Sequence, residues 1–235
     1  MNGSSSKGDA REGFSTRHSR TLSWAMTDWV TISALATASG TLVLAVATFA
    51  SVRSANRAAR VAEQAFLIGQ RPLVMPSRLD DPPEKLMWGD EHWAHVEGGR
   101  GSVELVDGKV YLAMSLRNVG NGTAVLQGWR ARPRLQDATM EASDPEAFRP
   151  QLRDLYVPAG NVGFWQAAIR DASDPDHAWL QEHISGSALF LVELLYSDHE
   201  GGQRAIGLFT LAPGEGHHWI CSVVRHWNLD RPNPR

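Results

Sequence analysis

The stretch "SVELVDGKVYLAMSLRN", residues 102–118, decides the fold, because apolar and polar residues alternate on both sides of a two-residue turn. The dipeptide Asp107-Gly108 can take the positive φ values of a type I′ hairpin turn. After the turn, one face of the second run is apolar throughout and consists of Val110, Leu112, Met114 and Leu116. This stretch therefore predicts two antiparallel strands that place one face in a core.

Working outward, the same period of two recurs along the chain between the turn signals "NVGNG", "SDHEGGQ" and "APGEG". The expected strands are residues 73–78, 103–106, 110–116, 123–130, 162–169, 188–196, 204–211 and 217–225. Two segments with an Asp before a Pro, 142–148 and 172–179, are typical of short helices with an Asp N-cap. The sequence predicts a mainly β fold, an antiparallel β-sandwich of about eight strands with two short helices, over residues 72–227.

A different pattern precedes this domain. Residues 29–52, from the stretch "WVTISALATASGTLVLAVATFASVR", contain no charged residue and no histidine. As a helix they would be roughly 36 Å long, enough to cross a hydrocarbon core of about 30 Å. Trp24 and Trp29 lie at one end, where indole rings favour the membrane interface. A cleavable signal at Ala45-Val46-Ala47 is the alternative, but 28 residues precede the apolar run. Residues 1–28 are then a flexible leader.

The neck, residues 53–71, continues the helical pattern with alanines at spacings of three and four. Gly69 and Pro72 end it. Small residues four apart also recur within the span, and this spacing lets two helices pack closely as a homodimer. They are Ala34, Ala36, Ala38 and Gly40. The alternatives are that alanine is simply common in such spans and that the neck packs as a stalk on its own domain.

Charge is distributed unevenly along the chain. Through Arg71 there are eight Lys or Arg against four Asp or Glu, a net charge of +4, and the remainder has 15 against 22, or −7. An acidic C-terminal domain argues against nucleic-acid binding, which needs a basic surface. Arg53, Arg57 and Arg60 suit anionic lipid headgroups. With Arg71 they give the C-terminal side of the span one more positive charge than the N-terminal side, which favours a cytoplasmic C-terminal domain. Cys221 is the only cysteine, so no intrachain disulfide is possible.

The order of one span, an Ala/Arg-rich neck, "QRPLV" (residues 70–74) and "LRNVGNGTA" (residues 116–124) resembles a loose class of uncharacterised, membrane-anchored bacterial proteins. Residues 29–76 and 116–124 carry the likeness. It implies one N-terminal anchor in the bacterial inner membrane and a C-terminal β-sandwich-like domain facing the cytosol. It brings no catalytic residue, and the 28-residue leader departs from the very short N-terminus usual in that class.

Histidines occur in two segments that resemble metal-ligand sets. His92 and His95, within "WGDEHWAHVEGG" (residues 88–99), lie in a stretch expected to be a long loop. A metal or small-ligand site there competes with a plain solvated loop. In "HHWICSVVRHW", a strand places His217 and Cys221 on one face and His218 and His226 on the other, which favours a core strand with a buried thiol over zinc.

Arginines alternate in "WRARPR", so a strand presents Arg130, Arg132 and Arg134 on one face. Their guanidinium groups suit phosphate, carboxylate or an acidic protein partner. The alternative is a charged sheet edge that prevents aggregation. Glu193, inside the apolar run "ALFLVELLY", either faces solvent or is buried beside a cationic partner.

Common catalytic signatures are missing: the sequence has no GxSxG elbow, P-loop, HExxH or CxxC pair. The expected function is therefore a membrane-anchored binding or interaction module with a protein partner and no cofactor. One alternative is an enzyme with its site in residues 88–99. Another is an extracytoplasmic domain that binds ligands in the cell envelope. The tail, residues 228–235, is expected to be disordered.

Overall fold

The computed structural model describes residues 16–134, 141–214 and 218–233. The chain divides into two compact units, residues 1–64 and 65–235. Helix α1 spans Thr16–Gly69 and ends where the glycine and Pro72 predicted an end. Residues 16–28 are helical, which differs from the expected flexible leader. No Gly or Pro interrupts the chain between Ser15 and Ser39, so nothing in that stretch stops the helix.

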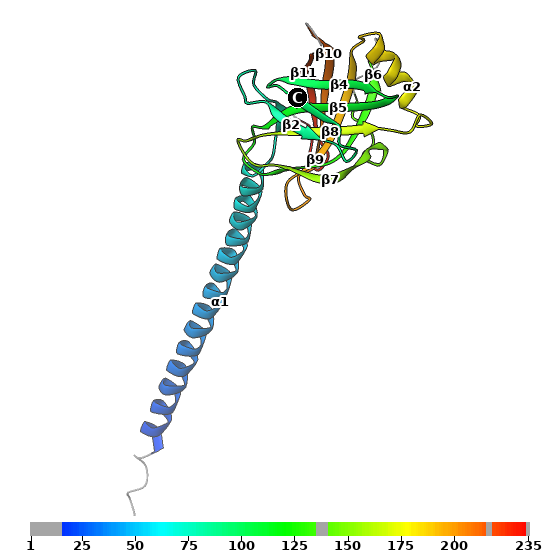
Figure 1. The fold of residues 1–235 in the computed structure, drawn as a ribbon. Coiled ribbons are helices and arrows are strands. Elements are labelled where there is room, and N and C mark those ends of the chain that lie inside the picture. The colour runs from blue at the N-terminus through cyan, green and yellow to red at the C-terminus, as the bar shows by residue number, and fades with distance from the viewer. Residues whose placement is uncertain (1–15, 135–140, 215–217, 234–235) are drawn as a thin grey trace, which may run out of the picture. The chain divides into compact units, whose positions relative to one another are not determined.

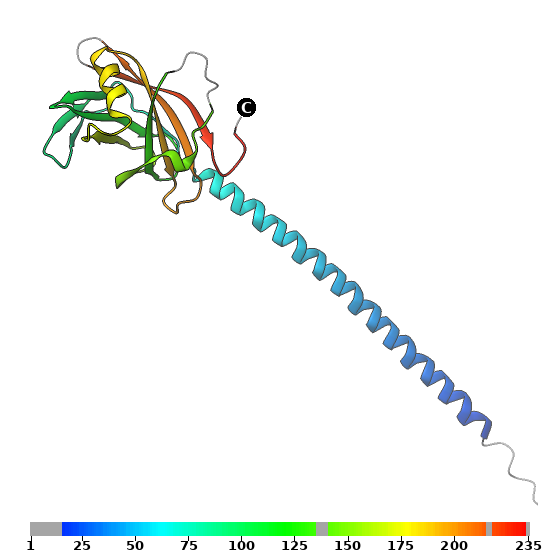
Figure 2. The same ribbon diagram turned by 90° about the vertical axis from the view of Figure 1, so that its right-hand side faces the viewer.

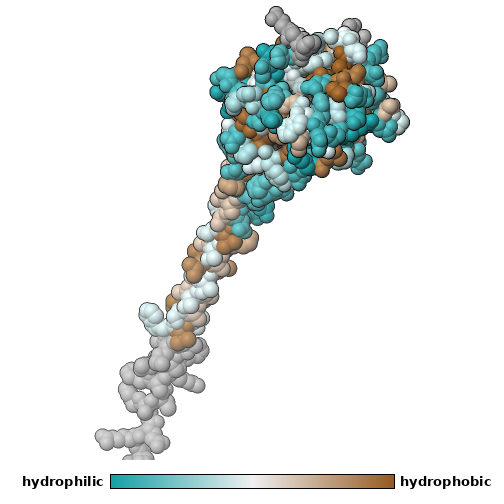
Figure 3. All heavy atoms as spheres, viewed as in Figure 1, coloured by the Kyte–Doolittle hydropathy of each residue, from teal (hydrophilic) through white to brown (hydrophobic). Residues whose placement is uncertain are grey.

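Between Trp29 and Val52, α1 is exposed and carries apolar and weakly polar side chains; Figure 3 shows brown and white spheres along the helix. From Asp28 to Gly69 it is long and apolar enough to cross a membrane, and none of the apolar window is buried within the protein. Five hydroxyl groups in the span donate hydrogen bonds to carbonyls one turn earlier; Thr41 Oγ1, for example, lies 2.8 Å from Thr37 O. Such bonds satisfy these donors within the helix, as a lipid environment requires.

The second unit is a single antiparallel sheet that curls around a core (Figures 1 and 2). The strands that the sequence predicted are β1 (Val74–Pro76), β4 (Arg100–Val106), β5 (Lys109–Asn118), β6 (Ala124–Pro133), β8 (Val162–Ile169), β9 (Phe190–Ser197), β10 (Ala205–Pro213) and β11 (Trp219–Asn228). The order of the sheet is β1-β5-β4-β11-β10-β9-β6-β7, and β8 pairs with the other edge of β5. The predicted mainly β, antiparallel fold with two short helices is confirmed.

The stretch from residue 102 to 118 forms the expected hairpin. Asp107 and Gly108 have φ values of 51° and 73°, and Val106 pairs with Lys109 across the turn. The predicted apolar face of β5 lies in the main core. The opposite face is buried as well, because Tyr111 and Ala113 lie beneath a second small sheet.

This small sheet replaces the loop expected at residues 88–99. It is a hairpin of β2 (Glu84–Met87) and β3 (Trp93–Val96), whose turn includes Glu91 at a φ of 62°. Two strands of only four residues, close to Pro82-Pro83 and Gly98-Gly99, give little strand signal. The strand β7 (Arg149–Val157) was also missed. It contains Pro150, and proline in a strand is typical of edges and bulges.

The two short helices are η1 (Pro145–Ala147) and α2 (His177–Ser185). The Asp144 side chain caps η1 by accepting a hydrogen bond from the Glu146 amide, as predicted. Asp174 makes the matching contact with the Asp176 amide at 2.9 Å. In the second segment the chain then forms a further turn, so α2 begins at residue 177 and runs past the expected end at 179.

The segments "QRPLV" and "LRNVGNGTA" lie against each other within residues 65–235. Asn118 is fully buried, and its amide bonds both segments: Oδ1 accepts from the Leu73 and Gly120 amides, and Nδ2 donates to the Gly122 and Val157 carbonyls. A Cβ on Gly122 would lie 1.8 Å from Gln70 O. These motifs therefore fix the chain after α1 to the sheet, which is a structural role.

Candidate functional site

The curled sheet has a seam where its two end strands, β7 and β8, approach each other. No backbone pairing joins them in the described residues; instead Gln151 Nε2 donates to Gln166 O at 2.8 Å. Strand β7 bulges at this point, because residues 151–154 stand opposite the single residue Gln127 of β6. The bulge carries Leu152 outward, where 91% of its surface is exposed.

A pocket of about 560 Å³ lies at this seam. Its walls are residues 149–153 of β7, residues 166–168 of β8 and residues 87–89 at the end of β2, with Trp129 and Arg170 completing it. We call it the seam pocket. Trp88 and Trp129 are almost fully buried and supply apolar wall, while the exposed Leu152 and the half-exposed Met87 stand at its mouth.

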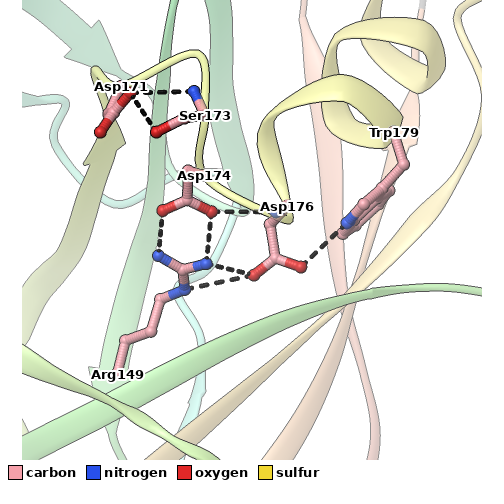
Figure 4. A network of polar contacts seen from close by, with 6 residues as sticks. All are labelled: Arg149, Asp171, Ser173, Asp174, Asp176 and Trp179. Atoms are coloured by element: carbon pink, nitrogen blue, oxygen red, sulfur yellow. Dashed lines mark hydrogen bonds and ion pairs between the residues drawn. The ribbon is translucent and has the colours of Figure 1, made fainter.

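Arg149 fixes one wall of the seam pocket (Figure 4). Its guanidinium makes a bidentate pair with Asp174, at 2.5 and 2.6 Å, and bonds Asp176 at 2.6 Å. It also lies 5.4 Å from the centre of the Trp129 ring, a cation–π distance. The hydrogen bonds that Arg149 donates to Asp174 raise the pKa of Arg149 and lower the pKa of Asp174. Strand β7 is thereby tied to the segment before α2.

The β2–β3 hairpin fixes the opposite wall. Trp88 Nε1 donates to Ala167 O at 3.0 Å, so the hairpin is joined to β8. Behind it, Asp90 accepts hydrogen bonds from Arg170 at 2.9 Å and from the Tyr111 hydroxyl at 2.5 Å. The pKa of Asp90 is lowered, chiefly by Arg170 and then by Tyr111. Burial, and then Asp90, raise the pKa of Tyr111.

The seam pocket therefore has an apolar interior, two arginines already neutralised by aspartates, and one further arginine. Arg153 forms no ion pair with any described residue. A pocket of this size and lining matches the concave, mainly apolar sites that bind small molecules. This arrangement can bind a ligand whose apolar part lies between Trp88 and Trp129 and whose hydrogen-bond acceptor lies near Arg153.

The predicted histidine site has a different geometry. His92 Nε2 lies 2.9 Å from Glu104, and its ring stacks on Tyr111 at 4.0 Å. His95 alternates with the buried Ala94 and Val96 and is exposed on the other face of β3. The two histidines therefore point to opposite faces. Within the described residues, no group of three or more His, Cys, Asp or Glu side chains could hold a metal ion.

Of the three arginines predicted to lie in a row, Arg130 and Arg132 contact a network around the buried Glu193, and Arg134 is exposed to solvent. Glu193 has no exposed surface and lies opposite Arg130 on the neighbouring strand. Its carboxylate is 3.2 Å from Arg132 Nη2 and accepts a hydrogen bond from Ser143 Oγ, which in turn accepts one from Arg130. Only Arg134 is exposed. Two of the three arginines therefore serve the sheet's own buried carboxylate.

Strand β11 has a buried thiol, as predicted. Cys221 Sγ lies 3.5 Å from Met114 Sδ, and burial raises its pKa to about 12. A register shift opposite Leu208 and Phe209 leaves Val224 without a partner, which turns His226 toward the core rings of Tyr196 and Phe209. His226 was expected on the other face. His217 lies outside the described residues, and His218 is exposed.

The residues predicted to meet the membrane lie on α1. Trp29, Arg53, Arg57 and Arg60 are exposed, and the Trp24 side chain lies outside the described residues. The small residues of the predicted dimer face are exposed too, and nothing lies within 4 Å of where a Cβ on Gly40 would be. Lipid contact and dimerisation stay predictions.

Sequence reasoning missed the seam pocket altogether. Its residues come from four separate segments, and Pro150, which is compatible with a bulge, does not by itself predict the strand β7. The tryptophans were the one available signal, since aromatic side chains near turns are frequent binding anchors. Searches of protein-family models, curated proteins and solved structures found no match to this chain.

Proposed function

We propose that this chain is a single-pass membrane protein whose β domain binds a small, mainly apolar ligand in the seam pocket. The observation that carries the proposal is the pocket itself: about 560 Å³, walled by Trp88 and Trp129, at an unpaired junction of the sheet. Arg149 and the β2–β3 hairpin hold both walls in place, so the site is formed before a ligand arrives.

The anchor in this proposal rests on the exposed apolar surface of α1. A contiguous apolar surface of this length is rare in water and is satisfied by lipid. The balance of arginines around the span favours a cytoplasmic β domain, in the inner membrane of a bacterium. The ligand would then be captured from the cytosol beside the membrane, and the domain would act as an anchored binding module.

A tethered apolar probe tests the pocket. We expect acrylodan attached to a Leu152→Cys variant to enter the seam pocket and to emit at shorter wavelength than the same label on Leu79→Cys. Leu79 is also exposed but lies outside the pocket. The buried Cys221 thiol, with its raised pKa, is not labelled in the folded protein. Fluorescence emission spectra of the full chain in detergent give the measurement.

A pocket-filling variant supplies the control. Gly89 lines the seam pocket, and a Cβ there would meet nothing within 4 Å, so we expect Gly89→Phe to fold and to place its ring in the pocket. In the Gly89→Phe variant, the label at residue 152 should emit at the same wavelength as the label at residue 79. Free 2-naphthol should displace the label from the seam pocket of the protein with Gly89 and should have no effect on the Gly89→Phe variant. Equal emission wavelengths from the labels at residues 152 and 79 in the protein that keeps Gly89 would overturn the proposal.

The placement of the domain has its own prediction. A reporter fused after Arg235 that is active only in the cytoplasm should be active, and one that is active only outside should be silent. The expected result follows from four arginines within about 20 residues on the C-terminal side of the span against three on the other. Activity of the external reporter instead would place the seam pocket outside the cell and reject a cytosolic ligand.

A further inference from the structure

A second, smaller pocket of about 310 Å³ lies within residues 65–235, where the chain leaves α1. Two arginines that are far apart in sequence line it, Arg71 from "QRPLV" and Arg231 after β11. Asn121, His226, Leu73 and Ile68 are further lining residues. We call it the Arg71 pocket. It is separate from the seam pocket, with which it shares no lining residue.

The positive charge in the Arg71 pocket is not neutralised by a direct ion pair. Arg71 Nη2 makes one long contact, 3.5 Å from Arg204 O, and neither Arg71 nor Arg231 forms an ion pair with a described residue. Asp230, whose charge acts on Arg71, already pairs with Arg204. The pKa of Arg71 is lowered, first by partial burial and then by the charge of Arg231. Two guanidinium groups thus share a pocket and repel each other.

The main chain of Arg71 is fixed by its own groups: its carbonyl accepts from the Asn121 amide at 3.2 Å, and its amide donates to Ile68 O at 3.4 Å. The Asn121 side chain makes no hydrogen bond with the described residues and remains available as a donor. His226 Nε2 is bonded to Val74 O at 2.8 Å, so one wall of the pocket is rigid.

From this arrangement we infer that the Arg71 pocket binds a phosphate group. The guanidinium groups of Arg71 and Arg231 and the side-chain amide of Asn121 hold it. Paired guanidinium groups match the oxygens of phosphate through charge-assisted hydrogen bonds. The bound anion also removes the repulsion between the two arginines. The phosphate can belong to a soluble molecule or to a lipid headgroup, and both present the same oxygens.

Titration with inorganic phosphate tests the inference. The full chain, in dodecyl maltoside micelles that carry no phosphate, should broaden the ³¹P line of phosphate saturably, with sodium chloride keeping the ionic strength constant. Arg71→Gln/Arg231→Gln should weaken binding at least tenfold, since each lost charge-assisted contact removes a large part of a weak affinity. Arg231→Gln alone, at an exposed position, should weaken it several-fold without affecting folding.

Arg78→Gln is the matched control, because it removes the same charge from an exposed position outside the pocket. It should leave phosphate binding unchanged. Phosphatidylglycerol added to the micelles separates the two sources: competition with phosphate identifies a lipid headgroup, and binding unaffected by the lipid identifies a soluble phosphate. Absence of saturation, or equal weakening by Arg78→Gln, would overturn the inference whether or not the seam pocket binds its ligand.

Discussion

Replacing Arg132 with methionine should lower the free energy of unfolding by about 3 kcal/mol, although the side chain lies at the sheet surface. The reason is Glu193, which has no exposed surface and whose carboxylate lies 3.2 Å from Arg132 Nη2. Methionine fills similar space but leaves a buried carboxylate with Ser143 as its remaining close partner. Removing one member of a buried ion pair costs far more than the pair itself contributes. Urea unfolding of the full chain in detergent, followed by tryptophan fluorescence, measures the loss.

The double variant Arg132→Met/Glu193→Leu should recover most of that stability and lie within about 1 kcal/mol of the wild type, because no charge remains buried. Arg134→Met is the control, since Arg134 follows directly after β6, is exposed and pairs with no described residue. It should change stability by less than about 0.5 kcal/mol. Equal losses from Arg132→Met and Arg134→Met would show that the Glu193 network contributes nothing.

This network shows how far the sequence could predict a candidate site. Alternation in "WRARPR" correctly indicated that Arg130 and Arg132 lie on one strand, but β6 ends at Pro133, before Arg134. Their partner could not be inferred, because Glu193 comes 61 residues after Arg132 and meets it only through the pairing of β6 with β9. A row of arginines suggests binding of an external anion when the sequence alone does not show that the partner is a carboxylate of the same domain. The open alternative for Glu193, burial beside a cation, describes the structure.

Strands with strong local signals were predicted well, and strands formed by context were not. The hairpin around Asp107-Gly108 has both alternation and a turn dipeptide, and the structure reproduces it. Strand β7 has Pro150, exposed charges and a bulge, so it is a strand only because β6 offers an edge to pair with. Since β7 and β8 form the seam pocket together, the weak strand signal of β7 explains why the sequence predicted neither the strand nor the pocket.

The end of the chain gives a similar lesson. Composition predicted a disordered tail for residues 228–235, yet residues 228–233 are held at the sheet. The Leu229 amide donates to Arg204 O at 3.0 Å, and Asp230 pairs with the Arg204 side chain. Asn228 Nδ2 donates to Pro232 O at 3.2 Å. Polar residues next to prolines resemble a disordered segment in the sequence; the contacts that hold them come from Arg204, directly before β10.

The second large effect is expected at Asn118, where alanine should lower the free energy of unfolding by about 4 kcal/mol. Four main-chain groups lose their partner at once: the buried carbonyls of Gly122 and Val157 and the partly buried amides of Leu73 and Gly120. Each unsatisfied group costs about 1–3 kcal/mol, and rearrangement or water entry recovers part of the sum. Urea unfolding, as for Arg132, gives the value.

Asn121→Ala is the matched control for Asn118→Ala, because both asparagines lie in "NVGNG" and the Asn121 side chain makes no hydrogen bond with the described residues. It should cost less than about 0.5 kcal/mol. Gly122→Ala tests the same junction sterically. Its Cβ would lie 1.8 Å from Gln70 O, whereas a Cβ on Gly89 meets nothing within 4 Å. We expect Gly122→Ala to cost more than about 3 kcal/mol and Gly89→Ala to be nearly neutral.

These results would give "QRPLV" and "LRNVGNGTA" a physical explanation. The glycines leave room for the main chain of residues 70–72, and Asn118 supplies the hydrogen bonds that an irregular crossing lacks. The same crossing brings Arg71 to its pocket, so the junction both closes the domain and creates the proposed phosphate site. If Asn118→Ala and Asn121→Ala proved equally stable, the junction would not depend on the buried amide, and the two motifs would require another explanation.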